Sequence, residues 1–333
     1  MAKLSLDRLQ DLAVRALIAS KTSPGNAGSV AAALVAAEAD GQAGHGLSRL
    51  PYYADQAISG KVDGLAVPEA EVTAAAAVRV DARDGFAYPA IDLGFDHVLT
   101  MVEKTGVVAL AITGSHHFGV AGYHVESLAD RGLLALAFSN SPAAIAPWGG
   151  ARALFGTNPV AMACPRRKGP PLVIDLSLSK VARGKINVAA GKGEPIPEGW
   201  ALDKGGRPTT DARAAMEGTM LPAGGLKGAL LVFMVEVLAA ALTGSNFGYE
   251  ASSFFDAEGP PPRIGQLFLV LRPECLSGKG FTDRVEELLS AITDQPGARL
   301  PGARRLAARL DARRSGVEVA DGLLADLGRR AGD

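Results

Sequence analysis

The sequence predicts an α/β protein in which a central sheet lies beside helical segments from both ends of the chain. Helical spacing of apolar residues fills the first sixty positions and returns after Thr282. Between these ends, the short apolar runs 107–112 and 133–138 flank a helical pattern, which indicates parallel strands in a βαβ unit. With 333 residues, 48% of them hydrophobic, the chain can bury a core without disulfides or metals.

The individual elements follow from caps and breakers. Ser5 can cap a first helix, which Ser23-Pro24-Gly25 ends. Segment 41–46 holds three glycines and is expected to be irregular. The remaining expected helices are 26–40, 48–59, 90–104, 120–130 and a long buried one at 226–242; the remaining expected strands are 72–80, 160–164, 172–175 and 267–271.

Composition and charge exclude several classes of protein. The formal net charge of −1 gives no basic field for nucleic acid, and the arginines between Arg299 and Arg314 are interpreted as a solvated helix face. The longest apolar stretch, 229–242, is interrupted by Glu236 and falls short of the ~20 residues that span a bilayer. Early charges exclude a secretory signal, and two distant cysteines predict neither a disulfide scaffold nor a cysteine zinc site. We expect a cytoplasmic protein.

The first candidate site is Gly44-His45-Gly46-Leu47-Ser48-Arg49. His45 lies between glycines on irregular backbone, and Arg49 follows four residues later at the start of a helix. The pair suits reduction of a carbonyl or imine beside a carboxylate, because an arginine binds a carboxylate with two hydrogen bonds and a histidine supplies the proton. The alternative is a loop histidine and a surface arginine.

The second candidate is Ser115–Gly122, at the carboxyl end of an expected strand and the start of a helix. Open α/β sheets bind ligands there, and a helix N-terminus favours a phosphate. A zinc site built from His116, His117 and His124 is the alternative, but no HExxH pattern supports it. A packing role for one of the adjacent histidines is also open.

Three further segments are candidates for substrate or cofactor binding, but for each of them a purely structural role is at least as well supported. Thr157 and Asn158 either line a pocket or close an Asn-Pro turn. Asp175 either accepts hydrogen bonds from a ribose or, like Ser177, caps a helix. Lys227 follows two glycines at a helix start, where it either faces a phosphate or is exposed in a turn. No GxGxxG or Walker A pattern is present.

Taken together and in order, these segments resemble the malate/L-lactate dehydrogenase family, which includes ureidoglycolate dehydrogenase, sulfolactate dehydrogenase and Δ1-piperideine-2-carboxylate reductase. The resemblance extends from about Leu6 to Leu327. The matching stretches are GHGLSRLPYY, SHHFGVAGYH, GTNPVAMACP, IDLSLSKVARGKI, IPEGWALDKGGRPTTD and LPAGGLKG.

The resemblance implies an L-sulfolactate dehydrogenase-like, non-Rossmann fold: a central mixed sheet with helices on both faces and a helical layer from the terminal segments. It implies NADH or NADPH as cofactor, no metal, and a homodimer with the active site in the cleft between subunits. The expected division is a helical substrate and dimer segment (1–70), an α/β cofactor-binding core (71–280) and C-terminal helices packing back on the first segment (281–333).

Site roles follow from the same resemblance. His45 and His117 are the candidate acid/base histidines, with Arg49 as the third catalytic residue. Arg49 and Thr157 are expected to hold substrate. The expected cofactor contacts are His117, Phe118, Gly119, Val120, Ala121, Ser141, Asp175, Leu176, Ser177 and Lys227, with Arg304 and Arg305 as candidates for a phosphate.

Two departures from the family pattern bear on the substrate. Gly44 stands where relatives often carry serine, and Lys185 stands where the cyclic-imine reductases carry aspartate, so the relay that serves the histidine there is missing. We therefore expect reversible hydride transfer to the carbon beside the carboxylate of a small 2-oxo acid. The alternative within the class is reduction of a cyclic ketimine; from other classes, a non-catalytic binding protein or a zinc hydrolase.

Overall fold

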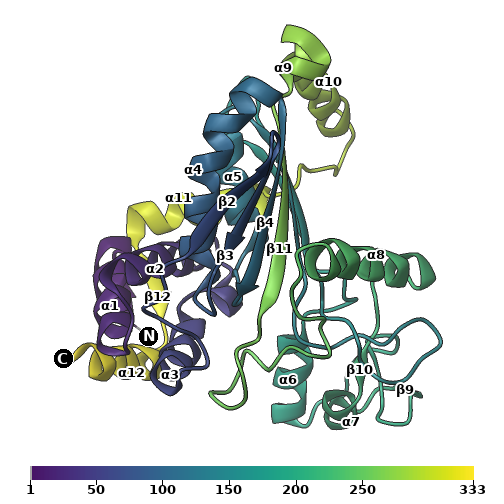
Figure 1. Cartoon of the computed structure of the whole chain (residues 1–333). Helices are drawn as coiled ribbons and strands as arrows, with labels where there is room; N and C mark the ends of the chain where they lie inside the picture. Colours follow the sequence, from purple (N-terminus) through teal and green to yellow (C-terminus); the bar gives the residue numbers. More distant parts are fainter. Residues whose placement is uncertain (1) are drawn as a thin grey trace.

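The computed structural model describes residues 2–333, and its centre is a twisted sheet of seven strands (Figure 1). The strand order is β2-β3-β4-β11-β5-β6-β7. Their bounds are β2 Glu69–Ala74, β3 Ala77–Asp81, β4 Val107–Ser115, β11 Ile264–Leu271, β5 Leu134–Ser139, β6 Val160–Cys164 and β7 Leu172–Leu176. The mixed α/β sheet expected from the sequence is confirmed.

Strand β11 occupies the middle of this sheet. It pairs antiparallel with β4 on one side and with β5 on the other. The two strands of the expected βαβ unit therefore run in the same direction but are separated by a strand that arrives late in the chain. β11 is largely buried, which is why its sequence is nearly continuous in apolar residues.

Helices cover both faces of the sheet, as expected. Helices α4 (Ala87–Thr105) and α5 (Ala121–Ala129) pack on one face, and the π-helical turn η3 (Val237–Ala241) that continues α8 (Leu226–Glu236) packs on the other. The T-shaped contact between Phe95 of α4 and Phe268 of β11, with ring centroids 5.2 Å apart, lies in the core between helix and sheet.

Two sequence-based expectations are wrong in detail. The strand expected at 72–80 is a hairpin, because the chain turns at Ala75 and Ala76 so that β2 pairs antiparallel with β3. The helix expected to be buried at 226–242 has one exposed side, since only part of its apolar surface reaches the sheet.

The terminal segments form one helical layer, which lies beside the lower end of the sheet in Figure 1. Its N-terminal helices are α1 (Leu6–Ala19), α2 (Pro24–Ala39) and α3 (Leu50–Ser59). Strand β1 (Ala2–Leu4) pairs antiparallel with β12 (Val317–Val319), and α12 (Asp321–Ala331) packs on α1 and α3. The expected packing of the two ends is confirmed.

The rest of the C-terminal segment divides between two places. Helix α11 (Ala303–Ser315) contacts α2, whereas α9 (Glu274–Ser277), η4 (Gly278–Gly280) and α10 (Phe281–Thr293) lie at the far end of the sheet (Figure 1). There Arg166 forms a two-pronged ion pair with Glu286 of α10. The division of the chain at residues 70 and 280 therefore stays a prediction. Within the C-terminal segment, the part that contacts the N-terminal helices begins at α11.

A smaller lobe completes the fold on the other side of the sheet. It contains α6 (Arg183–Lys192), α7 (Ala212–Glu217) and a three-stranded sheet of β10 (Thr219–Met220), β8 (Ala201–Leu202) and β9 (Pro208–Thr209). Its core joins Ile145, Ile186 and Met220 to Val235 of α8. Within residues 2–333 no helix is both long and apolar enough to cross a membrane.

Candidate active site

The segment that carries His45 and Arg49 follows the C-terminal end of α2. Gly41 has a left-handed conformation with φ of 72°, and two short 3-10 turns follow, η1 (Ala43–His45) and η2 (Leu47–Arg49). The Glu38 carboxylate accepts a hydrogen bond from the Leu47 amide at 2.9 Å and lies directly against Gly46, where any side chain would clash. The glycines therefore shape this irregular segment, as the sequence predicts.

The structure brings His45 and His117 together although they are distant in sequence. Their ring centroids are 5.6 Å apart, and His117 lies two residues after the end of β4. Desolvation, reinforced by the Arg49 charge, lowers the pKa of both histidines, and that of His117 falls well below its ordinary value. These shifts favour the neutral imidazole in both residues, although His45 is exposed, so each ring keeps one unprotonated nitrogen.

The Arg49 guanidinium has one buried nitrogen without a hydrogen-bond partner among the described residues. Its Nε atom donates to the Gly44 carbonyl at 2.7 Å, and its Cζ atom lies 4.5 Å from the centre of the Phe255 ring. Its Nη1 atom is buried and has no hydrogen-bond partner among the described residues. A buried donor without a partner is costly, so this guanidinium is suited to an incoming carboxylate.

Two buried tyrosines support His117, and we assigned neither of them a role from the sequence. The Tyr53 hydroxyl lies 2.6 Å from His117 Nδ1 and 3.3 Å from the Tyr88 hydroxyl. Burial raises the pKa of Tyr53 to about 12, so the phenol stays protonated. With Nδ1 held by Tyr53, Nε2 is the ring nitrogen left for proton exchange. The i, i+4 spacing from Arg49 to Tyr53 was the sequence signal for this residue.

The other two histidines of the second motif are packed into the core. His116 is 1% exposed, and its ring lies 5.2 Å from that of Tyr53 and 5.3 Å from that of Phe254. His124 stacks on Phe118, and its Nε2 atom lies 2.8 Å from the Phe118 carbonyl. Burial lowers the pKa of His116 to about 3 and that of His124 to about 4. The packing role considered for one of the adjacent histidines therefore belongs to His116.

The start of α5 is a glycine-containing turn that adjoins the end of β7. Gly119 has φ of 71° and lies against the Tyr88 hydroxyl, and Val120 gives the helix no side-chain cap. The Gly122 amide donates to Asp175 Oδ2 at 2.8 Å. Burial raises the pKa of Asp175, although this hydrogen bond opposes the change. The Phe118–Ala121 backbone and the end of β7 therefore adjoin.

The remaining cofactor and substrate candidates lie in segments that touch one another. The Leu178 amide donates to the Thr157 carbonyl at 2.9 Å, and the Ala223 amide donates to the Leu178 carbonyl at 2.8 Å. The Thr157 amide donates to the Ser141 hydroxyl at 3.1 Å. The exposed candidates on or beyond these segments are Leu176, Ser177 and Lys227.

Asn158 supports this region from behind instead of lining it. It is fully buried with φ of 38°, and its Nδ2 atom donates to Glu236 Oε2 at 2.7 Å. Glu236 also accepts hydrogen bonds from Asn140 and from the Gly248 amide. Burial raises the pKa of Glu236 although these donors oppose the change. Of the two roles considered for Asn158, the structure gives it the one in the turn.

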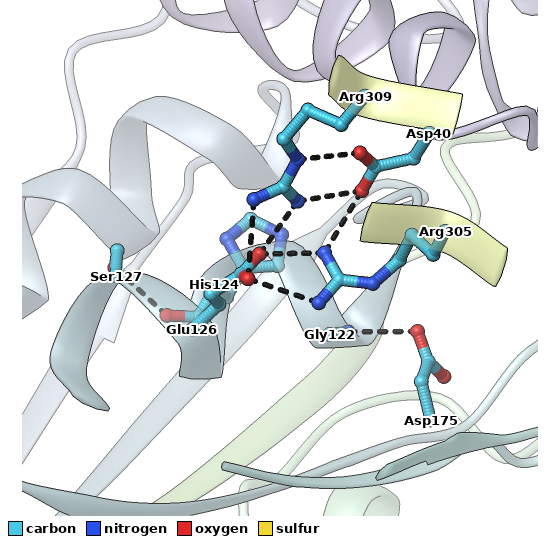
Figure 2. Close-up of polar contacts among 8 residues, drawn as sticks. All are labelled: Asp40, Gly122, His124, Glu126, Ser127, Asp175, Arg305 and Arg309. Carbon is cyan, nitrogen blue, oxygen red and sulfur yellow. Dashed lines mark hydrogen bonds and ion pairs between the residues drawn. The ribbon is translucent and has the colours of Figure 1, made fainter. Parts of the chain in front are cut away.

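Arg305 lies in a cluster of four charged side chains, shown in Figure 2. Arg305 and Arg309 of α11 both form ion pairs with Asp40 at the end of α2 and with Glu126 of α5. Arg304 is exposed and makes no ion pair within residues 2–333. The described part of the chain contains no group of three His, Cys, Asp or Glu residues placed to hold a metal ion.

Comparison with known proteins places this geometry in context. Residues 4–328 match the family model described as malate/L-lactate dehydrogenase. The (2R)-3-sulfolactate dehydrogenase (NADP(+)) of Chromohalobacter salexigens is 54% identical over 324 residues, which are 97% of this chain and 96% of that protein.

Two solved structures are similar over nearly the whole chain. The crystal structure of Δ1-piperideine-2-carboxylate reductase from Pseudomonas syringae pv. tomato has a TM-score of 0.94 at 40% identity and covers 99% of this chain and 100% of that chain. The sulfolactate dehydrogenase from Methanocaldococcus jannaschii has a TM-score of 0.91 at 28% identity and covers 99% of this chain and 97% of that chain. The sulfolactate dehydrogenase-like fold expected from the sequence is thereby confirmed.

Proposed function

This chain belongs to the malate/L-lactate dehydrogenase family, and we propose that it interconverts a small 2-hydroxy acid and its 2-oxo acid with NADP(H), with (2R)-3-sulfolactate as the first candidate substrate. The observation that carries the proposal is the meeting of Arg49, which has a free buried donor, with the neutral imidazoles of His45 and His117. Sulfolactate is the first candidate because the relative that is 54% identical acts on it.

The residues suggest how each part of the reaction is served. Arg49 binds the carboxylate, which fixes the neighbouring carbon in one orientation. The bound nicotinamide supplies the hydride chemistry at that carbon. In oxidation, His117 accepts the hydroxyl proton at Nε2, in the tautomer whose Nδ1–H donates to the Tyr53 hydroxyl oxygen. In reduction, the carboxylate offsets the Arg49 charge that lowers the pKa of His117, so the imidazole more readily carries the proton that it returns.

The residues present fit a dinucleotide. Gly119 leaves the turn before α5 free of a side chain, and Val120 gives this helix no side-chain cap, so its first turn can face a phosphate beside Asp175, to which the Gly122 amide already donates. Ser141, Asp175, Leu176 and Ser177 lie on adjoining segments, and Lys227 is the second residue of α8, whose N-cap is Gly225. We assign the phosphate contact near α11 to Arg304, because the Arg305 guanidinium is already paired with two carboxylates.

The active form in this proposal is a homodimer. Helix α8 and its continuation expose an apolar face that includes Leu230, Phe233 and Val237. Beside it lies an apolar hollow of about 200 Å³, lined by Leu136, Phe138, Val160, Ala161, Met162, Ile174, Leu178, Leu231 and Met234. A monomer rarely leaves so much contiguous apolar surface in water, so we propose that a second copy of the chain covers it.

The deciding assay measures oxidation of NADPH and NADH with sulfopyruvate, oxaloacetate, pyruvate and Δ1-piperideine-2-carboxylate. We expect turnover of a 2-oxo acid with NADPH to exceed turnover of the cyclic imine. Arg49→Met should raise KM for the 2-oxo acid strongly, and His117→Ala should lower kcat. No turnover of any of these compounds would overturn the proposal and favour a binding protein.

Cyclic ketimine reduction is the second candidate function. The structural likeness to Δ1-piperideine-2-carboxylate reductase, with a TM-score of 0.94, favours it. Against it, Gly44 and Lys185 replace the residues expected to form the relay, and both are exposed here. Faster reduction of the cyclic imine than of every 2-oxo acid would establish this function instead.

A further inference from the structure

Residues 247–262 form a long segment between η3 and β11, which we call the strap. At its base the Asn246 amide donates to the Arg263 carbonyl at 2.8 Å. Arg263 also forms a two-pronged ion pair with Asp84, with both distances 2.7 Å. The two ends of the strap are therefore close together and fixed to the sheet, while its middle reaches α3.

A buried lysine ties the middle of the strap to the end of α3. The Lys61 side chain is 1% exposed, and its Nζ atom lies 2.8 Å from Asp256 Oδ1 and 3.1 Å from the Asp256 carbonyl. Gln56, which is fully buried on α3, donates to the same carbonyl at 2.7 Å. A buried ammonium is costly unless it is paired, so the Lys61–Asp256 contact strongly favours one position of the strap.

The two residues before Asp256 touch the candidate catalytic groups. Phe254 is 5% exposed, and its ring centroid lies 4.9 Å from that of His117. The Phe255 ring lies 4.5 Å from Arg49 Cζ, and Tyr52 meets its edge. One short stretch of the strap therefore contacts both the proposed proton carrier and the proposed carboxylate anchor.

We propose that the Lys61–Asp256 ion pair is a positioning device that sets the strap so that Phe255 orients Arg49 and Phe254 orients His117. Lys61 and Asp256 act only through the two phenylalanines. The proposal rests on the proposed 2-oxo acid chemistry and adds to it the residues that prepare the anchor for substrate. Among the described residues, the Arg49 guanidinium makes one hydrogen bond, from Nε to the Gly44 carbonyl. The Phe255 ring supplies a second contact that orients it.

The expected effect falls on substrate binding more than on cofactor binding. A cation–π contact at a half-exposed site corresponds to roughly a two- to five-fold change in an equilibrium constant. Phe255→Leu should therefore raise KM for the 2-oxo acid about two- to five-fold, and Phe255→Tyr, which keeps the ring, should restore it. Lys61→Met and Asp256→Asn should raise KM more, because they release both phenylalanines together.

The experiment compares these four variants with Lys21→Met, in the full-length protein. Lys21 is an exposed lysine that binds the Ile58 carbonyl of α3 without touching the strap, so its variant should behave like the wild type. KM, kcat and the NADPH dissociation constant are measured, together with chymotrypsin cleavage at Phe254 and Phe255. We expect raised KM, NADPH affinity within two-fold, and faster cleavage within the strap for Lys61→Met and Asp256→Asn.

The outcomes separate this proposal from the proposed function. Unchanged KM in an active Phe255→Leu variant, or an equal loss of NADPH affinity in every strap variant, would overturn the positioning role. Phe255 is half exposed, so this variant tests the proposal even if Lys61→Met fails to fold. If the wild type reduces no 2-oxo acid, oxamate binding measured by calorimetry decides instead: weaker binding in Phe255→Leu supports the proposal, and equal binding refutes it.

Discussion

Removal of Arg309 tests how strongly the charged cluster of Figure 2 stabilises the fold. Arg309 donates to both Asp40 oxygens at 2.6 and 2.7 Å and to both Glu126 oxygens at 3.1 and 2.7 Å. The side chains of both carboxylates are 7% exposed. In Arg309→Met, Arg305 alone remains to pair with two buried carboxylates, so the cluster changes from neutral to one uncompensated negative charge.

The cost of this change follows from the burial of the cluster. Breaking a buried ion pair by removing one partner costs about 3–5 kcal/mol, since the other partner stays buried and unpaired. Arg309 is 22% exposed and Arg305 remains, which places the expected loss at the lower end, about 3 kcal/mol. For a chain of this length that loss lowers Tm by roughly 4 °C.

The assay is thermal unfolding of the cofactor-free protein at one fixed scan rate, with Arg313→Met as the matched control. Arg313 lies on the same helix, is exposed, and forms no ion pair within residues 2–333, so its removal should change the free energy of unfolding by less than about 0.5 kcal/mol. Equal Tm values for the two variants would refute the reasoning that burial makes the cluster costly to break.

The same cluster predicts a dependence of stability on pH. Burial acts to raise the pKa of Glu126, but hydrogen bonds from Arg305 and Arg309 outweigh it and the net pKa is lowered from 4.5. A carboxylate with a lowered pKa in the folded state stabilises the protein above its unfolded-state pKa, and this contribution is lost as the pH falls through the folded-state pKa. The difference in Tm between wild type and Arg309→Met should therefore shrink below about pH 4.

Three further predictions concern the site and the assembly. Tyr53→Phe removes only the hydroxyl group near His117 Nδ1. We expect kcat to fall about ten-fold, which corresponds to a lost hydrogen bond of about 1.4 kcal/mol, and NADPH affinity to stay constant. A kcat equal to that of the wild type would contradict a role for Tyr53. The pKa of His117 is lowered in the free enzyme, so kcat/KM for 2-hydroxy acid oxidation should not decline between pH 8 and about pH 6. A decline with a midpoint near the ordinary histidine pKa, about 6.5, would contradict a neutral imidazole. Leu230→Asp, on the exposed face of α8, should give a monomer in sedimentation at micromolar concentration, whereas a stable dimer would show that the face is not the interface.

Local patterns predicted the elements well, and they predicted the order of the strands poorly. Hydrophobic runs identified β4 and β5, and the glycines identified the irregular segment before Arg49. No local pattern shows that β11, which follows β5 by well over one hundred residues, inserts between them. Strand insertion of this kind depends on long-range pairing, which periodicity does not encode.

The candidate site shows the same division between local and distant contacts. His45 and Arg49 were identifiable because four residues separate them, and the start of α5 because it follows a strand end. The support for His117 comes from Tyr53 on one side and Phe254 on the other, and the three residues lie on separate segments. Such contacts are fixed by the tertiary fold, so they could not be predicted from spacing.

The arginines of α11 show where composition alone was misleading. They were interpreted as one solvated face, yet Arg305 and Arg309 are four residues apart and therefore share the side of the helix that meets Asp40 and Glu126. Arg304 lies about 100° around the helix from Arg305 and is exposed. A helix that fixes one arginine in a buried ion pair can hold its neighbour at a defined position in solvent. The ion pairs of Arg305 fix α11 against α2 and α5 and leave Arg304 exposed, so Arg304 stays available for the phosphate contact that we propose.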